Sequence, residues 1–171
     1  MNALPARDQP SDAMKARFAL VALLTLAATG CGASAPLVTV DKLLAQCEAF
    51  KGKPVQLAGY LGVCVHYECD LAADETHWRA YASAFNAAHR GQLPERREAW
   101  SRAFAVPLIG VGGNKTLDAK AATLQYSYVI ISGTIAKDSC DGRGGTDRTS
   151  GVDPTNIRAW TRSEGAPATT K

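Results

Sequence analysis

The stretch KPVQLAGYLGVCV, residues 53–65, decides the fold that the sequence predicts. Five of its apolar residues alternate and would share one side of a β-strand: Val55, Leu57, Leu61, Val63 and Val65. Gly59 and Gly62 interrupt this pattern and indicate a bulge or a sharp bend. Because such a bend lets one long strand serve both sides of a closed sheet, the stretch predicts a small β-barrel.

A short helix is expected just before this strand. Residues 41–50 (DKLLAQCEAF) start with Asp41 and are followed by Gly52, as helix capping prefers. Four apolar residues would share one face of this helix: Leu43, Leu44, Cys47 and Phe50. Residues 68–71, after the long strand, are predicted to begin the return strand.

Residues 74–104 break the β pattern with an alanine-rich segment. Aromatic residues recur in it at helical spacing, and Pro94 suits the first turn of a second helix. The aromatic residues are Trp78, Tyr81, Phe85, Trp100 and Phe104. We expect a helical hairpin or a single broken helix that covers the barrel. The aromatic stripe is either a docking surface or is buried against the barrel.

Further strands are predicted at residues 105–111, 126–137 and 157–161, with a long Gly- and Asp-rich loop at 138–154. The strand at 126–137 is apolar on both faces, so we expect it to be central. The predicted fold class is mainly β with α: a five-stranded barrel with an N-terminal helix and a helical insertion. This domain would span residues 38–162. The polar segment 163–171 is predicted to be a disordered tail.

The overall composition is that of an ordinary globular protein. The chain has 171 residues, of which 46% are hydrophobic, and a net charge of +3. A length near the usual ~100–200 residues per domain predicts a single domain. So small a net charge does not favour nucleic acid or an anionic membrane surface as a partner.

Residues 1–30 are predicted to be a signal peptide. Lys15 and Arg17 precede the apolar run FALVALLTLAA, which small residues follow, and this is the secretory pattern. The run is shorter than the about 20 apolar residues that a transmembrane helix needs. The sequence leaves open whether the chain starts at Met1 or at Met14.

The segment LAATGC, residues 26–31, resembles the bacterial lipobox, in which a small residue precedes the cysteine that becomes the lipidated N-terminus. The resemblance implies diacylglyceryl and palmitate attachment at Cys31, which would anchor the protein in a membrane. Gly32 rather than Asp follows this cysteine, and in a Gram-negative cell that favours the periplasmic face of the outer membrane. Residues 31–37 would form a small-residue tether. The alternative is an ordinary secreted protein with an incidental Cys31.

Four more cysteines follow Cys31, and outside the cytoplasm an even set usually forms disulfides. Four cysteines allow three pairings. Cys64 and Cys69 are separated by VHYE, the length of a hairpin loop, so we favour this pair. Cys47 would then pair with Cys140.

Three motifs are similar to those of bacterial OB-fold-like lipoproteins and periplasmic proteins: GKPV at residues 52–55, GYL at 59–61, and a strand from Tyr128-Val129 to Gly133-Thr134. The loop with Cys140, Asp147 and Arg148 also fits this family outline. The resemblance implies an OB-like form for the predicted barrel. Members of this group mostly lack an assigned activity, so the resemblance does not imply a ligand.

Motifs for cofactor or metal chemistry fail on spacing. Residues 110–116 (GVGGNKT) are similar to a phosphate-binding loop, but Asn114 and Lys115 stand where such motifs need glycine, so we expect a surface turn. Three loop acids lack EF-hand spacing, although a looser calcium site stays open: Asp138, Asp141 and Asp147. A zinc site lacks the paired CxxC spacing; its ligands would be Cys64, Cys69, His66 and His77. No cofactor and no metal is predicted.

OB folds commonly bind ligands on one face with aromatic and basic residues. The candidates here are Tyr60, His66, Tyr67, Tyr126, Arg143 and Arg148, unless these residues only pack the core and rim. No serine lies in a nucleophile elbow. The sequence thus favours a non-catalytic binding or adaptor module for an envelope protein or small ligand. The alternative is an envelope hydrolase or metal-dependent enzyme that uses His66, His77 or His89.

Overall fold

The long strand predicted from residues 53–65 organises the sheet. The computed structural model describes residues 34–65, 68–113, 115–141 and 151–161. In it, β2 (Pro54–Val65) pairs antiparallel with β3 (Glu68–Ala72) on one side and with β5 (Ser127–Ile135) on the other. β2 is therefore an interior strand of the sheet.

The predicted bulge is present, and it changes which side chains are buried. The pairing of β2 with β3 shifts register between Leu61 and Cys64. Beyond the shift Cys64 is buried, Val63 is only partly buried and Val65 is 50% exposed. The prediction that Val63 and Val65 share the buried side with Leu61 is therefore wrong, because one extra residue turns the following side chains to the opposite face.

The sheet has six strands and is not closed into a barrel, which corrects the predicted five-stranded barrel. Its order is β4 (Leu108–Gly110), β3, β2, β5 and β6 (Val152–Ala159), and β1 (Leu37–Thr39) adds a parallel pairing to β2. Within the described residues, the two edges of the sheet are joined by a bridge between Val111 and Val152, where Gly112 N donates to Val152 O at 2.9 Å.

The N-terminal helix is split in two. Helices α1 (Val40–Ala45) and α2 (Cys47–Phe50) meet at Gln46, whose φ of −125° is not helical. The cap of α1 is Thr39 rather than Asp41, since the Thr39 side chain accepts from Lys42 N at 3.4 Å. Gly52 follows α2 with a φ of +68°, a conformation that glycine adopts without steric cost.

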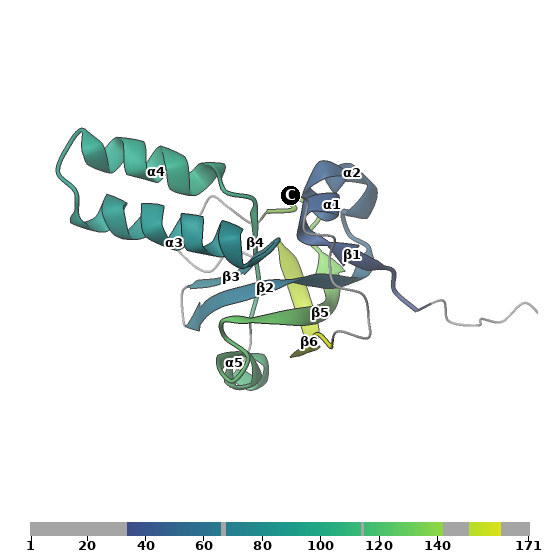
Figure 1. Cartoon of the computed structure of the whole chain (residues 1–171). Helices are drawn as coiled ribbons and strands as arrows, with labels where there is room; N and C mark the ends of the chain where they lie inside the picture. Colours follow the sequence, from purple (N-terminus) through teal and green to yellow (C-terminus); the bar gives the residue numbers. More distant parts are fainter. Residues whose placement is uncertain (1–33, 66–67, 114, 142–150, 162–171) are drawn as a thin grey trace, which may run out of the picture. The chain divides into compact units, whose positions relative to one another are not determined.

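The predicted helical hairpin is confirmed. Helices α3 (Glu75–Arg90) and α4 (Glu95–Ala105) pack against each other and bury small side chains; these are Ala84, Ala88, Ala99 and Ala103. The expectation that the hairpin covers the sheet is wrong. Figure 1 shows α3 and α4 extending beyond the sheet, and α3 contacts β2 and β3.

Two elements differ from the prediction near the C-terminal half. Helix α5 (Lys115–Ala122) occupies part of the expected surface turn and sets Leu117 and Ala121 into the core. Strand β6 begins at Val152, inside the predicted loop 138–154. The strand predicted at 126–137 is central, since β5 lies between β2 and β6.

The core lies between the sheet and the helices α1 and α5. It consists of aliphatic side chains, and no polar or charged residue in the described part of the chain is buried. The largest members include Leu43, Leu57, Leu61, Leu71, Ile109, Ile131, Ile135 and Ile157. None of the helices within the described residues is long and apolar enough to span a bilayer.

Both favoured disulfides are present. Cys64 and Cys69 face each other across the β2–β3 hairpin with an S–S distance of 2.08 Å. Cys47 of α2 is joined to Cys140, after β5, with an S–S distance of 2.00 Å and a sequence separation of 93.

Candidate functional site

Two of the predicted ligand-face residues lie in the described part of the chain, and they are close to the same tryptophan. The rings of Tyr60 and Tyr126 lie 6.2 Å and 5.1 Å, respectively, from the ring of Trp78. Tyr60 is buried, whereas Tyr126 is 53% exposed. Of these two, only Tyr126 therefore offers substantial surface to a ligand.

Several predicted positions fall outside the described residues. They are the signal peptide, the lipid-attachment residue Cys31, residues 32–33 of the tether, the tail 163–171, and the site residues His66, Tyr67, Arg143, Asp147 and Arg148.

A row of aromatic rings continues from Tyr60 across the sheet. Tyr128 is the register partner of Tyr60 on β5, and their rings meet edge to face at 5.3 Å. Trp160, after β6, follows at 6.3 Å from Tyr128. Tyr128 and Trp160 were not among the predicted site residues. The sequence does carry a signal for Tyr128, since it opens the strand motif that was compared with OB-like proteins.

The exposed end of this row opens into a hollow of about 250 Å³ between the β2–β3 hairpin and α3, here called the aromatic pocket. Four aromatic rings line it together with two carboxylates and an amide. Its lining residues are Val63, Glu68, Asp70, Trp78, Tyr81, Ala82, Phe85, Asn86 and Tyr126. The sequence placed Trp78, Tyr81 and Phe85 in an aromatic stripe that was expected to be either a docking surface or buried against the barrel.

Trp78 reaches its place because Gly62 has no side chain. A Cβ atom on Gly62 would overlap the indole nitrogen of Trp78, so the indole lies directly on the β2 backbone. On the other side, the rings of Trp78 and Tyr126 meet at an interplanar angle of 74°. Gly62 thus permits the contact that sets one wall of the aromatic pocket.

Tyr126 is held in an uncommon backbone conformation. Its φ is +60°, in the left-handed region that residues with a side chain rarely adopt. Tyr126 N donates to Leu61 O at 2.8 Å, and the neighbouring Gln125 side chain donates to Cys64 O at 3.1 Å. These two bonds fix the chain to β2 just where the Tyr126 ring enters the pocket. Such conformations concentrate at functional sites.

Charge around the pocket is negative. Glu68 and Asp70 line it, and no lysine or arginine among the described residues does. Close by, burial and then the carboxylate of Glu75 raise the pKa of Tyr60, so its hydroxyl stays protonated well into alkaline pH. Arg79, which follows Trp78 on α3, is engaged with Glu75 at 2.6 Å.

The two described histidines, His77 and His89, have different neighbours on α3. The His77 backbone N donates to Asp74 Oδ1 at 2.9 Å, and His77 Nδ1 lies 2.9 Å from the same oxygen. Burial acts to raise the pKa of Asp74, but these hydrogen bonds outweigh it and hold the pKa below its ordinary value. His89 packs instead between Phe85, at 4.4 Å, and Trp100, at 5.2 Å.

The zinc alternative is wrong, because Cys64 and Cys69 are bonded to each other and have no thiolate to offer. Within the described residues no group of three or more His, Cys, Asp or Glu could hold a metal ion.

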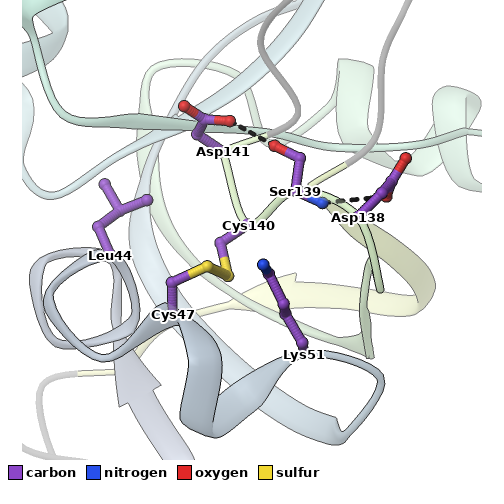
Figure 2. A pocket seen from close by; sticks show the side chains of 7 residues that line it. All are labelled: Leu44, Cys47, Lys51, Asp138, Ser139, Cys140 and Asp141. Carbon is purple, nitrogen blue, oxygen red and sulfur yellow. Dashed lines mark hydrogen bonds between the residues drawn. A yellow bond between two sulfur atoms is a disulfide. The ribbon is translucent and has the colours of Figure 1, made fainter.

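A second hollow, of about 290 Å³, lies beside the Cys47–Cys140 disulfide (Figure 2). Two of the acids considered for calcium, Asp138 and Asp141, lie on either side of Ser139. Ser139 uses both: its Oγ donates to Asp141 at 2.6 Å and its N–H to Asp138 at 3.0 Å. Both carboxylates thus accept hydrogen bonds from Ser139. In contrast to the aromatic pocket, this hollow has no aromatic side chain among the described residues that line it.

Comparison with known proteins finds no matching family model, no similar curated protein and no similar solved structure.

Proposed function

We propose that the chain is a non-catalytic binding module of the bacterial cell envelope, held at a membrane through lipid on Cys31. The observation that carries the binding role is the aromatic pocket, where four rings and two carboxylates converge beside a tyrosine in a strained conformation. Concave sites with aromatic walls and a few polar groups are typical of ligand binding. The ligand would be a small molecule or a group on an envelope protein.

The fold part of the proposal is an OB-like arrangement of an open sheet. Its support is that β2 pairs with both β3 and β5 around a bulge, and that the sheet edges meet at Val111 and Val152. In OB-like folds ligands bind on one sheet face and its adjoining loops. The aromatic pocket lies at the β2–β3 hairpin, which is such a place.

The location part of the proposal rests on the sequence. Residues 15–31 combine basic, apolar and small residues before Cys31, in the order of a lipoprotein leader. The two disulfides are in keeping with an oxidising compartment. Gly32 favours the periplasmic face of the outer membrane.

The hydrolase alternative has less support from the geometry. His77 and His89 are both on α3, separated by about 18 Å along the helix axis at 1.5 Å per residue. Each is engaged with its own neighbours, Asp74 and Phe85 respectively. The two histidines therefore do not share one site.

Two measurements test the proposal. Mass spectrometry of the mature protein should find lipid on Cys31, and Cys31→Ser should move the protein out of the membrane fraction. Chemical crosslinking in intact cells should give an adduct with the wild-type chain that Tyr126→Ala loses and that Glu95→Gln, a distant substitution on α4, retains. An unlipidated Cys31 would overturn the anchor, and adducts unaffected by Tyr126→Ala would overturn the binding role.

A further inference from the structure

The aromatic pocket combines two features that select for one kind of ligand. Aromatic rings attract cations through the negative charge on their faces, and Trp is the strongest of them. Carboxylates attract the same cations by charge. The pocket supplies Trp78, Tyr81, Phe85 and Tyr126 for the first effect and Glu68 and Asp70 for the second.

We infer that the aromatic pocket binds an organic cation, specifically an alkylammonium group whose carbon atoms contact the rings while its charge faces Glu68 and Asp70. This inference rests on the proposed function, because it names the ligand class of the same binding site. Anions are disfavoured, since the described lining contains two carboxylates and no lysine or arginine.

The geometry of the rings suits a compact group rather than a flat one. Trp78 and Tyr126 meet at 74°, and Tyr81 and Phe85 at 39°, so the walls present ring surfaces in different planes. A flat ligand stacks best on parallel rings, whereas a tetrahedral ammonium group contacts rings from several directions. The volume of about 250 Å³ is below the ~300–1,000 Å³ of pockets for drug-sized ligands. It therefore fits one headgroup or one side chain.

Two arginines of the helical hairpin are engaged in ion pairs. Arg79, the residue after Trp78 on α3, is paired with Glu75 through Nε at 2.8 Å and Nη2 at 2.6 Å. Arg102 on α4 is paired with Glu98 at 2.7 Å. Neither arginine is among the described residues that line the pocket.

Two sources can supply an alkylammonium group: a small quaternary ammonium compound and the lysine side chain of a peptide. Both are tested by calorimetric titration of the disulfide-bonded chain at low salt. The first arm uses choline, with its neutral carbon isostere 3,3-dimethyl-1-butanol as the control ligand. The second arm uses a tripeptide with blocked ends and a central lysine, with norleucine in place of lysine as its control.

We expect choline or the lysine peptide to bind with a Kd on the order of millimolar, and the neutral isostere to bind more weakly. The double variant E68Q/D70N should weaken the cation about fivefold without changing the isostere. Glu95→Gln removes one exposed negative charge on α4 and should leave the affinity unchanged. Raising the salt concentration should weaken cation binding to the wild type. The arm that binds identifies the source.

Equal affinity for choline and its isostere would overturn the inference, and so would failure of both cations to bind or an unchanged affinity in E68Q/D70N. Circular dichroism of each variant verifies that it is folded. These outcomes are separate from the test of the proposed function. If crosslinked adducts depend on Tyr126 while neither cation binds, the module binds a different group and only the present inference fails.

Discussion

The indole ring of Trp78 lies directly against the backbone of Gly62, so that a methyl group on Gly62 would occupy the position of the indole nitrogen. This relationship couples the central strand β2 to the helical hairpin at the point where the aromatic pocket opens. Substitution of Gly62 by alanine, which replaces one α-hydrogen by a methyl group, therefore tests this contact.

Gly62→Ala should destabilise the fold by about 1–3 kcal/mol, because either the strand or the indole must move to accept the added carbon. Urea unfolding measures the loss, and near-ultraviolet circular dichroism reports displacement of Trp78. The control is a double-mutant cycle that combines Gly62→Ala with Trp78→Ala. If the indole is the obstacle, Gly62→Ala in the Trp78→Ala background should cost much less than in the wild type. Equal costs in both backgrounds would show that the glycine serves another purpose.

The left-handed conformation of Tyr126 gives a second prediction. Because its φ is +60°, glycine should be better tolerated there than alanine, and Tyr126→Gly should be more stable than Tyr126→Ala by about 1 kcal/mol. The matched comparison is Ala119→Gly inside α5, where glycine should instead be the less stable residue by a similar amount. Thermal unfolding of the four chains decides the matter. A Tyr126→Gly variant less stable than Tyr126→Ala would contradict the assigned backbone conformation.

Asp74 should stabilise the chain in a pH-dependent way. Its side chain caps α3 by accepting from His77 N at 2.9 Å, and the hydrogen bonds from His77 lower its pKa despite burial. A lowered pKa means that the stabilisation is complete above the ordinary value of 3.8 and is lost as the pH falls through the value in the folded state. Asp74→Ala should therefore cost about 1 kcal/mol at neutral pH and progressively less in acid.

The amide in Asp74→Asn keeps an acceptor for the cap but has no charge to titrate. The loss of unfolding free energy in Asp74→Asn should therefore be smaller than in Asp74→Ala, and it should not vary across the same acidic pH range. Unfolding curves of the three chains between neutral pH and acid provide the measurement. A loss in Asp74→Ala that stays constant down to the acid limit would refute the role given to the carboxylate.

The two disulfides should contribute unequally. In the chain-entropy model, the Cys47–Cys140 bond, with a sequence separation of 93, restricts the unfolded chain far more than the Cys64–Cys69 bond, with a separation of 5. Replacing Cys47 and Cys140 by alanine should cost about 4–5 kcal/mol, and replacing Cys64 and Cys69 about 2 kcal/mol. Denaturant unfolding of both variants compares them. Thiol titration of the unfolded, unreduced chain should find none of these four cysteines free.

The regular parts of the fold were predictable because local pattern and tertiary environment agree in them. Val55, Leu57 and Leu61 alternate and are buried on β2, and the spacing of the cysteines in the hairpin indicated their pairing. The helical hairpin was predicted for the same reason, since alanine-rich segments separated by Pro94 favour two helices.

The predictions of secondary structure and burial are wrong where the tertiary structure overrides the local sequence pattern. The bulge after Leu61 reverses the faces of Val63 and Val65, and no composition signal reports its exact position. Helix α5 buries only Leu117 and Ala121, too few apolar residues to give a clear period. Strand β6 contains Asp153 and Pro154, which locally indicate a turn, although Pro154 is tolerated on this edge strand.

The aromatic pocket could be predicted only in part. Tyr126 was expected on a ligand face, and the ring stripe on α3 was recognised. Their meeting was not, because Val63, Trp78 and Tyr126 are far apart in sequence and are brought together by the β2–β5 register and by the space above Gly62. Contacts between residues so far apart in sequence depend on the tertiary structure, and the periodicity of a single helix or strand does not predict them.

The bond between Cys47 and Cys140 also determines how the chain carries mechanical load. If tension is applied along the polypeptide from a point before Leu37 to a point after Ala159, the covalent path runs through α1, crosses the sulfur atoms and continues into β6. The intervening segment, with a sequence separation of 93, is bypassed. Once β1 and α1 have been peeled away and β6 has been unzipped, the tension passes through the disulfide, and β2, β3, the helical hairpin and the aromatic pocket lie outside the loaded covalent path. A ligand in the pocket is then not stretched with the ends of the domain.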